Sequence, residues 1–503
     1  MPFVNFPKIR AFTESGVFYN RNESQFSRKS AKILKTATRL VPLGIYLLPL
    51  SLALTSCSTT LKPPDLAGLY GKALEYHAID RNPVIVIPGI LGSKLQDAES
   101  GRIVWGAFER GYANPKTPEG ARLCALPMEI GTPLNGLSDD VVTSGALTSL
   151  RIRLLGLPLE LSAYAQILGT LGAGGYRDNA LYYGPDHFTC FQFPFDWRRS
   201  NAENATKLHE FILESEAYIK EEMLKRYDKK IDRVKFNIVA HSMGGLIARY
   251  YLRYGATPLP VDGTLPKLTW TGAERVKHLV MVATPNGGSA QSIEQLAFGL
   301  SLFPITRYAP AILGTFPSIY EMMPRARHGA VVDKDDPENF INFMDPSIWK
   351  EMNWGLARDD QRRMLENLLP DVADPEQRRR IALDHMEKCL RNAQQFHAAL
   401  DVPASPPPGT FINLFAGDAV PTVDVFSLDR RDGTLTPRVK AQGDATVTRR
   451  SALMDERREE DWSPVLKSPI DFHGVTFLFD SHLGMTKSPM FADNVLHLLL
   501  EQP

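Results

Sequence analysis

The stretch IVAHSMGGLI, Ile238–Ile247, places a serine between small residues at the end of an apolar run. Residues 234–239 predict a buried strand, and the residues after the serine predict a helix. A serine at a sharp strand-to-helix turn is the arrangement of a nucleophile elbow, which needs small neighbours because its backbone is strained. Ala240 and Gly244 supply them. We therefore expect Ser242 to be a nucleophile; the alternative is a small residue in a tight turn.

A serine hydroxyl becomes a good nucleophile only when a neighbouring base takes its proton, and histidine is the most common base. On this kind of elbow the acid and then the histidine follow the serine along the chain. We predict that His482 is the base, because it follows the predicted strand 475–479 at the end that emerges beside the serine. Other late histidines are less well placed: His385 and His397 in helical segments, and His473 at the opposite end of that strand.

The acid and the oxyanion donors are less narrowly defined by the sequence. Asp418 follows a predicted strand directly and Asp444 follows a later glycine, and spacing alone leaves both open as the acid or as turn-capping residues. An oxyanion needs two backbone N–H donors. We expect one from Met243, next after the serine, and the other from Ile90 in the loop IPGILGS after an early strand. We expect His241, beside the serine, to be structural.

Predicted strands alternate with predicted helices, which indicates a mostly parallel central sheet with helices on both faces. The segments that predict these strands are Pro83–Leu95, Phe188–Ser200, Val234–Val239, Val276–Ser289, Thr410–Asp418 and Gly474–Met485. Two long intervening segments, at about 96–185 and 290–405, are expected to form an inserted cap or lid. Ligands of such sheets bind at the carboxyl ends of the strands, where Ser242 is predicted to lie.

Two helices have clear start signals. Ser200 and Glu203 have the spacing of a capping box, and the helix that they open is predicted to run to about Tyr227. Asp374, followed by a proline, predicts the start of another helix. The apolar stretch Leu147–Tyr176 has two interpretations, an ordinary core helix with a strand or a lid that meets lipid.

The composition is that of an ordinary globular protein, with 503 residues of which 44% are hydrophobic and 23% charged. This length predicts a large core with insertions, or two lobes. Basic and acidic residues number 57 each, so the net charge gives no reason to expect nucleic acid. Beyond the N-terminal segment there are three cysteines, Cys124, Cys190 and Cys389, which allow one disulfide without selecting a pair.

The N-terminal segment has the pattern of a secretory signal. A basic region ends at Arg39, an uncharged apolar run spans Leu40–Leu54, and small residues then lead to Cys57. The run is short for a membrane span and contains two prolines. We expect residues 1–56 to be a signal peptide and residues 57–82 to be a tether.

The residues LTSC, Leu54–Cys57, resemble the bacterial lipoprotein box. The resemblance implies that Cys57 receives lipid and becomes the first residue of the mature chain, anchored at a membrane surface. Ser58 stands where an aspartate would retain the protein, which favours the outer membrane and hence a place in the cell envelope, on its periplasmic side. Ordinary cleavage and a short anchor helix are the alternatives.

Several motifs, taken in chain order, resemble those of the lecithin:cholesterol acyltransferase family, a branch of the α/β-hydrolases. They are VIVIPGILGSKL at the first predicted strand, FPFDWR at Phe193–Arg198, AHSMGG at the serine, ATPNGGS at Ala283–Ser289, PSIYEMMP at Pro317–Pro324, GDATVTRRS at Gly443–Ser451 and HLGM at His482. Each block is weak by itself, but the ordered set is specific. The resemblance implies an α/β-hydrolase catalytic domain over residues 83–503.

The resemblance also assigns roles that spacing leaves open. It selects Asp444 over Asp418 as the acid, because the Thr-Val pair of the family motif follows Asp444. It implies that Asp196, Trp197 and Arg198 shape the wall of the site rather than act in the chemistry. Family members bind lipid interfaces, cleave an ester-linked acyl group and pass it to an alcohol or to water, with no metal and no cofactor.

We therefore predict a serine-dependent lipid acyl-ester enzyme, an O-acyltransferase or a phospholipase or lipase, that forms an acyl-enzyme on Ser242. Its expected partners are a lipid or phospholipid acyl donor and an alcohol or water acceptor. The alternatives are a carboxylesterase of soluble esters and a non-catalytic lipid-binding lipoprotein on a hydrolase scaffold. The sequence departs from the family at the lid, which a cysteine pair closes in the animal enzymes, whereas Cys124 stands alone in that region.

Overall fold

The computed structural model describes most of the chain after residue 63. The described ranges are 64–74, 76, 81–106, 112–146, 151–154, 157–160, 163–302, 306–458 and 462–502. The predicted signal peptide, residues 1–56, and the predicted lipidation site Cys57 lie outside the described residues. Within the predicted tether, the structure forms helix α1, Leu66–Leu74. Its buried Tyr70 donates a hydrogen bond to Oδ1 of Asp493 at 3.2 Å.

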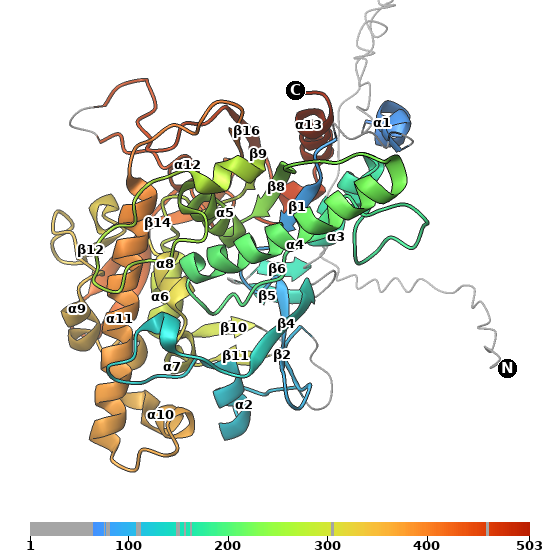
Figure 1. The fold of residues 1–503 in the computed structure, drawn as a ribbon. Coiled ribbons are helices and arrows are strands. Elements are labelled where there is room, and N and C mark those ends of the chain that lie inside the picture. Colours follow the sequence, from blue (N-terminus) through green and yellow to red (C-terminus); the bar gives the residue numbers. More distant parts are fainter. Residues whose placement is uncertain are drawn as a thin grey trace, which may run out of the picture. The chain divides into compact units, whose positions relative to one another are not determined.

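A six-stranded sheet forms the centre of the fold, with the strand order β16-β13-β9-β8-β1-β7 (Figure 1). Every neighbouring pair in it is parallel. Each strand overlaps a segment that the sequence predicted, so the predicted fold class is confirmed. The strands are β1 (Val84–Ile87), β7 (Cys190–Gln192), β8 (Phe236–His241), β9 (Val276–Val282), β13 (Phe411–Gly417) and β16 (Gly474–Leu478).

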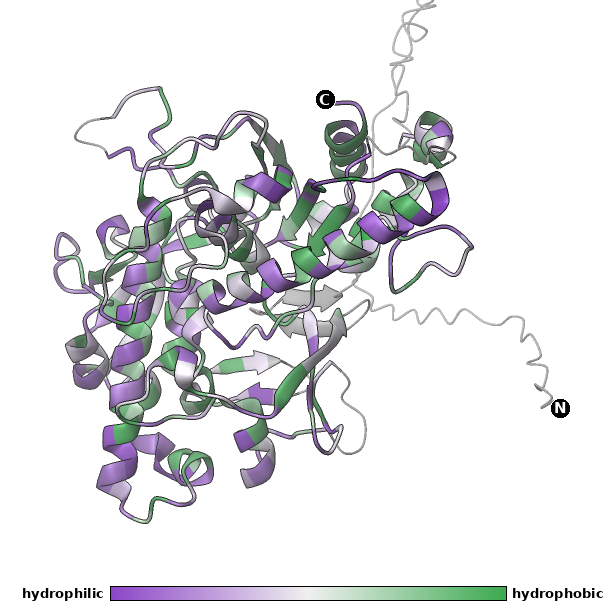
Figure 2. Ribbon diagram, viewed as in Figure 1, coloured by the Kyte–Doolittle hydropathy of each residue, from purple (hydrophilic) through white to green (hydrophobic). Residues whose placement is uncertain are grey.

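Both faces of this sheet are buried, as is usual for a parallel sheet. Successive residues of a strand point to opposite faces. In β8, Ile238 belongs to one hydrophobic core and Val239 to the other. The first core includes side chains of α4 and α5, and the second includes side chains of α3 and α13. In Figure 2 the central strands are mostly apolar, whereas α4 carries both polar and apolar residues. These helices are α3 (Ala163–Ala173), α4 (Asn201–Tyr227), α5 (Met243–Tyr254) and α13 (Pro489–Leu500).

Helix α4 occupies the predicted range, but its predicted capping box is wrong. The hydroxyl of Ser200 accepts an N–H of the first turn, as predicted. Glu203, however, pairs with Arg199 at 3.1 Å instead of reaching back to the cap. The carboxylate of Glu321 takes its place and accepts the Asn201 N–H at 2.7 Å and the Ser200 hydroxyl at 2.6 Å. Tertiary packing thus brings a distant carboxylate to the helix start, which local spacing does not reveal.

The first predicted insertion, at about 96–185, contains small antiparallel sheets and helices. The ambiguous stretch 147–176 contains both a β-hairpin, β5–β6, and the core helix α3. A second small sheet has the order β3-β2-β4. The elements before α3 are β2 (Ser93–Asp97), β3 (Ile103–Trp105), α2 (Pro118–Cys124), β4 (Val141–Ala146), β5 (Arg151–Leu154) and β6 (Leu157–Glu160).

The second predicted insertion, at about 290–405, is mostly helical. Its longest helix, α11, begins after Asp374, whose carboxylate accepts two N–H groups of the first turn, as the sequence predicted. Its elements are α6 (Gln291–Phe298), β10 (Leu300–Leu302), β11 (Thr306–Tyr308), α7 (Pro310–Leu313), α8 (Pro317–Glu321), β12 (Val331–Asp333), α9 (Pro346–Glu351), α10 (Arg362–Leu368) and α11 (Pro375–Asp401).

A three-stranded sheet connects this insertion to the chain that follows β13. Strand β12 pairs with β14 (Val420–Asp429), which pairs in turn with β15 (Thr434–Gly443). Helix α12 (Arg449–Leu453) follows. The sequence did not predict the β14–β15 hairpin. It carries the chain away from the end of β13 and back again, and Asp444 comes directly after it.

Two further features concern the membrane and the cysteines. No helix among the described residues is long and apolar enough to cross a membrane. Cys124, Cys190 and Cys389 are buried free thiols, so the disulfide that the sequence allowed among them is not formed.

Candidate active site

Ser242 lies at the sharp turn between β8 and α5. Its backbone angles, φ 53° and ψ −123°, are strained for a residue with a side chain. The turn is packed so closely that a Cβ on Gly244 would collide with the carbonyl oxygen of Pro88, and one on Gly245 would collide with Thr284. The small residues of the motif are therefore required by space as well as by conformation. This is the geometry of the predicted nucleophile elbow.

The structure brings Ser242, His482 and Asp444 together in one hydrogen-bonded chain. Oγ of Ser242 lies 2.9 Å from Nε2 of His482, and Nδ1 of His482 lies 2.9 Å from Oδ2 of Asp444. The backbone N–H of His482 also donates to the carbonyl oxygen of Asp444 at 2.8 Å. All three residues are buried. The arrangement can pass a proton from the hydroxyl to an imidazole that a carboxylate orients.

The carboxylate of Asp444 is itself held in place. Its Oδ1 accepts the backbone N–H groups of Thr446 and Val447 at 2.9 and 2.7 Å, which leaves Oδ2 for the imidazole. Asp418, the other candidate, makes no hydrogen bond to the serine or the histidine among the described residues and pairs instead with Arg449 at 2.7 Å. Of the two aspartates, only Asp444 thus lies in the position from which an acid orients the base.

The other late histidines lie elsewhere. His385 and His397 are buried on α11, where burial lowers their pKa values to about 4 and 3 and each ring contacts a backbone carbonyl. His473 packs against the ring of Phe411. His497, which the sequence reasoning did not consider, lies on α13 and pairs with Glu501. Among the described histidines, His482 is the one whose ring contacts the Ser242 hydroxyl.

The two expected oxyanion donors lie next to the serine. Met243 is the first residue of α5, where helix N–H groups lack partners within the helix. Ile90 follows Gly89 in the loop after β1 and lines the cavity above Ser242. Within the described part of the chain, neither N–H donates to a backbone carbonyl. Both groups are thus available to a negatively charged oxygen.

A mostly apolar cavity of about 690 Å³ opens onto Ser242 and His482. Further polar groups at its wall come from Ser289 and Thr446 and from three residues of α6, Gln291, Ser292 and Gln295. The apolar lining residues are Ile90, Leu91, Trp197, Pro285, Leu300, Tyr308, Leu313, Phe316, Ile319 and Met322.

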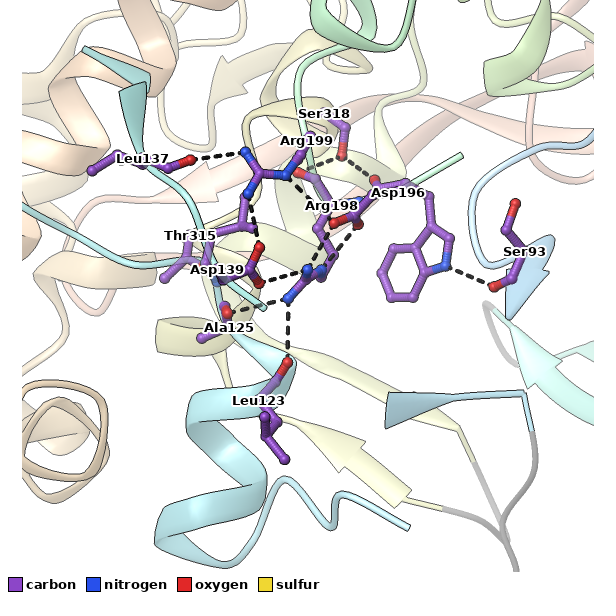
Figure 3. Close-up of polar contacts among 12 residues, drawn as sticks. Ser93, Leu123, Ala125, Leu137, Asp139, Asp196, Arg198, Arg199, Thr315 and Ser318 are labelled. Atoms are coloured by element: carbon purple, nitrogen blue, oxygen red, sulfur yellow. Dashed lines mark hydrogen bonds and ion pairs between the residues drawn. The ribbon is translucent and has the colours of Figure 1, made fainter. Parts of the chain in front are cut away.

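The wall around Trp197 is braced by a buried ion cluster (Figure 3). Trp197 lines the cavity, and its indole N–H donates to the carbonyl oxygen of Ser93 at 3.2 Å. Next to it, the fully buried guanidinium of Arg198 donates to both carboxylate oxygens of Asp196 and to Asp139. Its remaining N–H groups donate to the carbonyl oxygens of residues 123 and 125. Burial disfavours its charge, but the carboxylates outweigh burial and raise its pKa.

One buried residue beside the site was missed by the sequence reasoning. Tyr164, on α3, contacts both Gly89 and His241 through its hydroxyl. It lies inside the stretch 147–176 that the sequence left ambiguous, and no spacing rule connects it to the elbow.

Within the described ranges, no group of three or more His, Cys, Asp and Glu side chains is arranged to hold a metal.

Comparison with known structures supports the fold. One chain of the Tle4-Tli4 complex matches with a TM-score of 0.52 at 15% identity, covering 84% of this chain and 99% of the other. At this identity the likeness shows the fold alone. Two further structures match with lower TM-scores: EstA from Clostridium botulinum (12% identity, TM-score 0.30, covering 85% of this chain and 90% of the other) and lipase 1 from Pelosinus fermentans (13% identity, TM-score 0.31, covering 84% and 100%). No curated protein matches the chain.

The parallel sheet and the serine elbow together define an α/β-hydrolase fold. Within that class, residues 159–399 match the model of the lecithin:cholesterol acyltransferase family, which confirms the family that the sequence motifs indicated. The family match supports a general class of activity, that of a lipid acyl-ester hydrolase or acyltransferase.

Proposed function

We propose that this protein is a serine-dependent lipid acyl-ester enzyme that works through an acyl-enzyme. The observation that carries the proposal is the hydrogen-bonded chain of Ser242, His482 and Asp444 at the floor of an apolar cavity. In the first step the Ser242 oxygen attacks the ester carbonyl while His482 takes its proton. Asp444 keeps the imidazole oriented and offsets its positive charge.

The tetrahedral intermediate carries a negative oxygen, which the N–H groups of Ile90 and Met243 stabilise. As it collapses, the bond to the leaving alcohol breaks and His482 returns its proton to that alcohol. The acyl group stays on Ser242 as an ester. Water or a second alcohol then gives its proton to His482 and attacks, and the same steps in reverse free the serine.

A lipid substrate is supported by the family match and by the apolar lining of the cavity. An acyl chain gains about 0.8 kcal/mol per methylene group that it buries in such a lining. The proposal extends to an anchor: lipidation at Cys57, after removal of residues 1–56, would hold the enzyme at the periplasmic side of the cell envelope, in the outer membrane. Its substrates would then come from the membrane surface.

The decisive experiment follows labelled phospholipid through the reaction. Purified protein is incubated with phospholipid vesicles and a panel of alcohols, and the products are separated. We expect free fatty acid, or new acyl esters of an alcohol, from the wild type and neither product from Ser242→Ala. Ser427→Ala is the matched control, because Ser427 is another buried serine and lies on β14, outside the cavity lining.

The same assay separates the alternatives. A rate that does not rise when the substrate aggregates would favour a carboxylesterase of soluble esters over a lipid enzyme. Protein that binds the vesicles but releases no product from any ester would indicate the non-catalytic lipid-binding lipoprotein. Mass spectrometry of the mature N-terminus tests the anchor, and an unmodified Cys57 would contradict it.

A further inference from the structure

His241, which precedes the nucleophile, makes a hydrogen bond whose direction the chemistry fixes. Its Nε2 lies 3.1 Å from the backbone carbonyl oxygen of His482. A carbonyl oxygen can only accept, so Nε2 must carry the proton of the neutral ring. Nδ1 of the same ring is then an acceptor. The residue beside the serine therefore holds the main chain of the base.

Tyr164 continues this chain of hydrogen bonds in one direction. Its hydroxyl oxygen lies 3.3 Å from Nδ1 of His241, and since Nδ1 is an acceptor the hydroxyl must donate to it. The same oxygen accepts the backbone N–H of Gly89 at 2.7 Å. The chain thus runs from Gly89 N–H through Tyr164 and His241 to the carbonyl of His482. It joins the loop that carries Ile90 to the loop that carries the base.

Each link is buried and closely packed. Tyr164 and His241 are each 2% exposed. A Cβ on Gly89 would lie 2.9 Å from Cβ of Ser242, so the oxyanion loop rests directly on the elbow. Burial, together with the nearby His482, lowers the pKa of His241 to about 3. His241 therefore stays neutral while the ring of His482, with its centroid 5.0 Å away, gains and loses a proton.

We propose that Tyr164 and His241 are positioning residues that hold the oxyanion loop and the base at fixed places relative to Ser242. The inference rests on the proposed function, because it assigns these residues to the alignment of that reaction. Neither side chain touches the reacting atoms. Small displacements at an active site are costly, and about 1 Å of misplacement can lower a rate by about 100-fold.

The test compares single-group changes in the full-length protein. Tyr164→Phe removes only the hydroxyl, His241→Phe removes both ring nitrogens, and His241→Gln keeps an N–H donor near the position of Nε2. Tyr254→Phe is the matched control, since Tyr254 is fully buried and donates its hydroxyl to the carbonyl oxygen of Ala399 at 2.7 Å. The measurements are kcat and KM on a p-nitrophenyl ester, the affinity for an alkyl boronic acid, and the thermal unfolding midpoint.

We expect Tyr164→Phe and His241→Phe to lower kcat by about 10- to 100-fold with little change in KM. The boronic acid forms a tetrahedral adduct on serine, so its affinity should fall in parallel with kcat. Because the two residues belong to one series of hydrogen bonds, the kcat of the double variant should be no lower than that of His241→Phe alone. His241→Gln should recover part of the loss. Tyr254→Phe should keep wild-type kcat at a thermal midpoint as low as that of Tyr164→Phe.

The proposal is overturned if both single variants turn over within about threefold of the wild type, or if their rates fall while boronate affinity is unchanged. Multiplicative effects in the double variant would also overturn it, because independent residues behave in that way. Failure of the proposed function gives a different result, since the wild type would then neither turn over the ester nor bind the boronic acid.

Discussion

Two buried polar clusters lie near the cavity, one around Arg198 beside the lining residue Trp197 and one at Ser242, and they use their hydrogen-bonding capacity differently. At Arg198 every guanidinium donor is engaged, by Asp196, by Asp139 and by two carbonyl oxygens. At Ser242 the polar groups face a cavity, and the expected oxyanion donors meet no backbone acceptor in the described residues. The first cluster is complete by itself, and the second has capacity left for another molecule.

Unused hydrogen-bonding capacity separates a cluster that can do chemistry from one that is only structural. Ionisable side chains are buried in both, so burial alone does not distinguish them. What distinguishes Ser242 is strain at φ 53°, an unfilled space and unpaired donors. A buried cluster whose donors are all paired costs much free energy to break, because removing one partner leaves a buried charge uncompensated. This contrast predicts that changes in the Ser242 cluster lower the reaction rate, whereas changes in the Arg198 cluster lower the free energy of unfolding.

The largest expected effect is that of Asp444→Asn. An amide cannot orient the imidazole in the required tautomer or offset its charge, so the chemical rate should fall by roughly 10³- to 10⁴-fold. Asp418→Asn removes only a partly exposed ion pair with Arg449 and should change the rate by less than about threefold. Single-turnover kinetics on the two variants check this. A larger loss at Asp418 would overturn the choice of acid.

The next largest effect concerns the Arg198 cluster, in which every guanidinium donor is paired. Arg198→Met leaves Asp196 and Asp139 without their buried partner and should lower the free energy of unfolding by about 3–5 kcal/mol. The rate per active site of the folded fraction should stay near wild type. Urea denaturation, with Arg431→Met as an exposed ion-pair control, measures the first quantity. A large fall in rate without a loss of stability would contradict the division between the two clusters.

Much of the site was predictable because its signals are local. A buried strand, a small-residue turn and a helix occur within a few residues of Ser242, and His482 directly follows another strand. The acid required the family resemblance, because Asp444 reaches the site only after the β14–β15 hairpin turns the chain back. Glu321 and Tyr164 were not predictable, since distant packing alone brings them to α4 and to Gly89.

Glu321 provides a third case, a buried carboxyl surrounded by donors. Burial raises its pKa to about 7, although hydrogen bonds from Ser200, Asn201 and Asn392 oppose the rise. The unfolded chain therefore releases this proton more easily than the folded protein. As pH rises from about 4.5 to 7, the free energy of unfolding should fall by about 3 kcal/mol from this group. Glu321→Gln should flatten the stability curve in that window, and an unchanged slope would contradict the assignment.

The smallest effect tests whether space, rather than glycine itself, marks the elbow. Gly169 is exposed on α3, and a Cβ there would meet nothing within 4 Å. Gly169→Ala should therefore raise the free energy of unfolding by roughly 0.5–1 kcal/mol. Gly244→Ala should lower it and also lower the rate, because the methyl group would push against the Pro88 carbonyl. Thermal unfolding and esterase assays compare the two, and equal stabilities would show that the elbow is not tightly packed.

The site at which a fluorophosphonate reacts tests most directly whether Ser242 is the nucleophile. The protein is treated with the probe and digested, and mass spectrometry locates the label. We expect one label per chain, on Ser242, absent from Ser242→Ala and formed much more slowly in Asp444→Asn. A label on another residue, or undiminished labelling of Ser242→Ala, would contradict it.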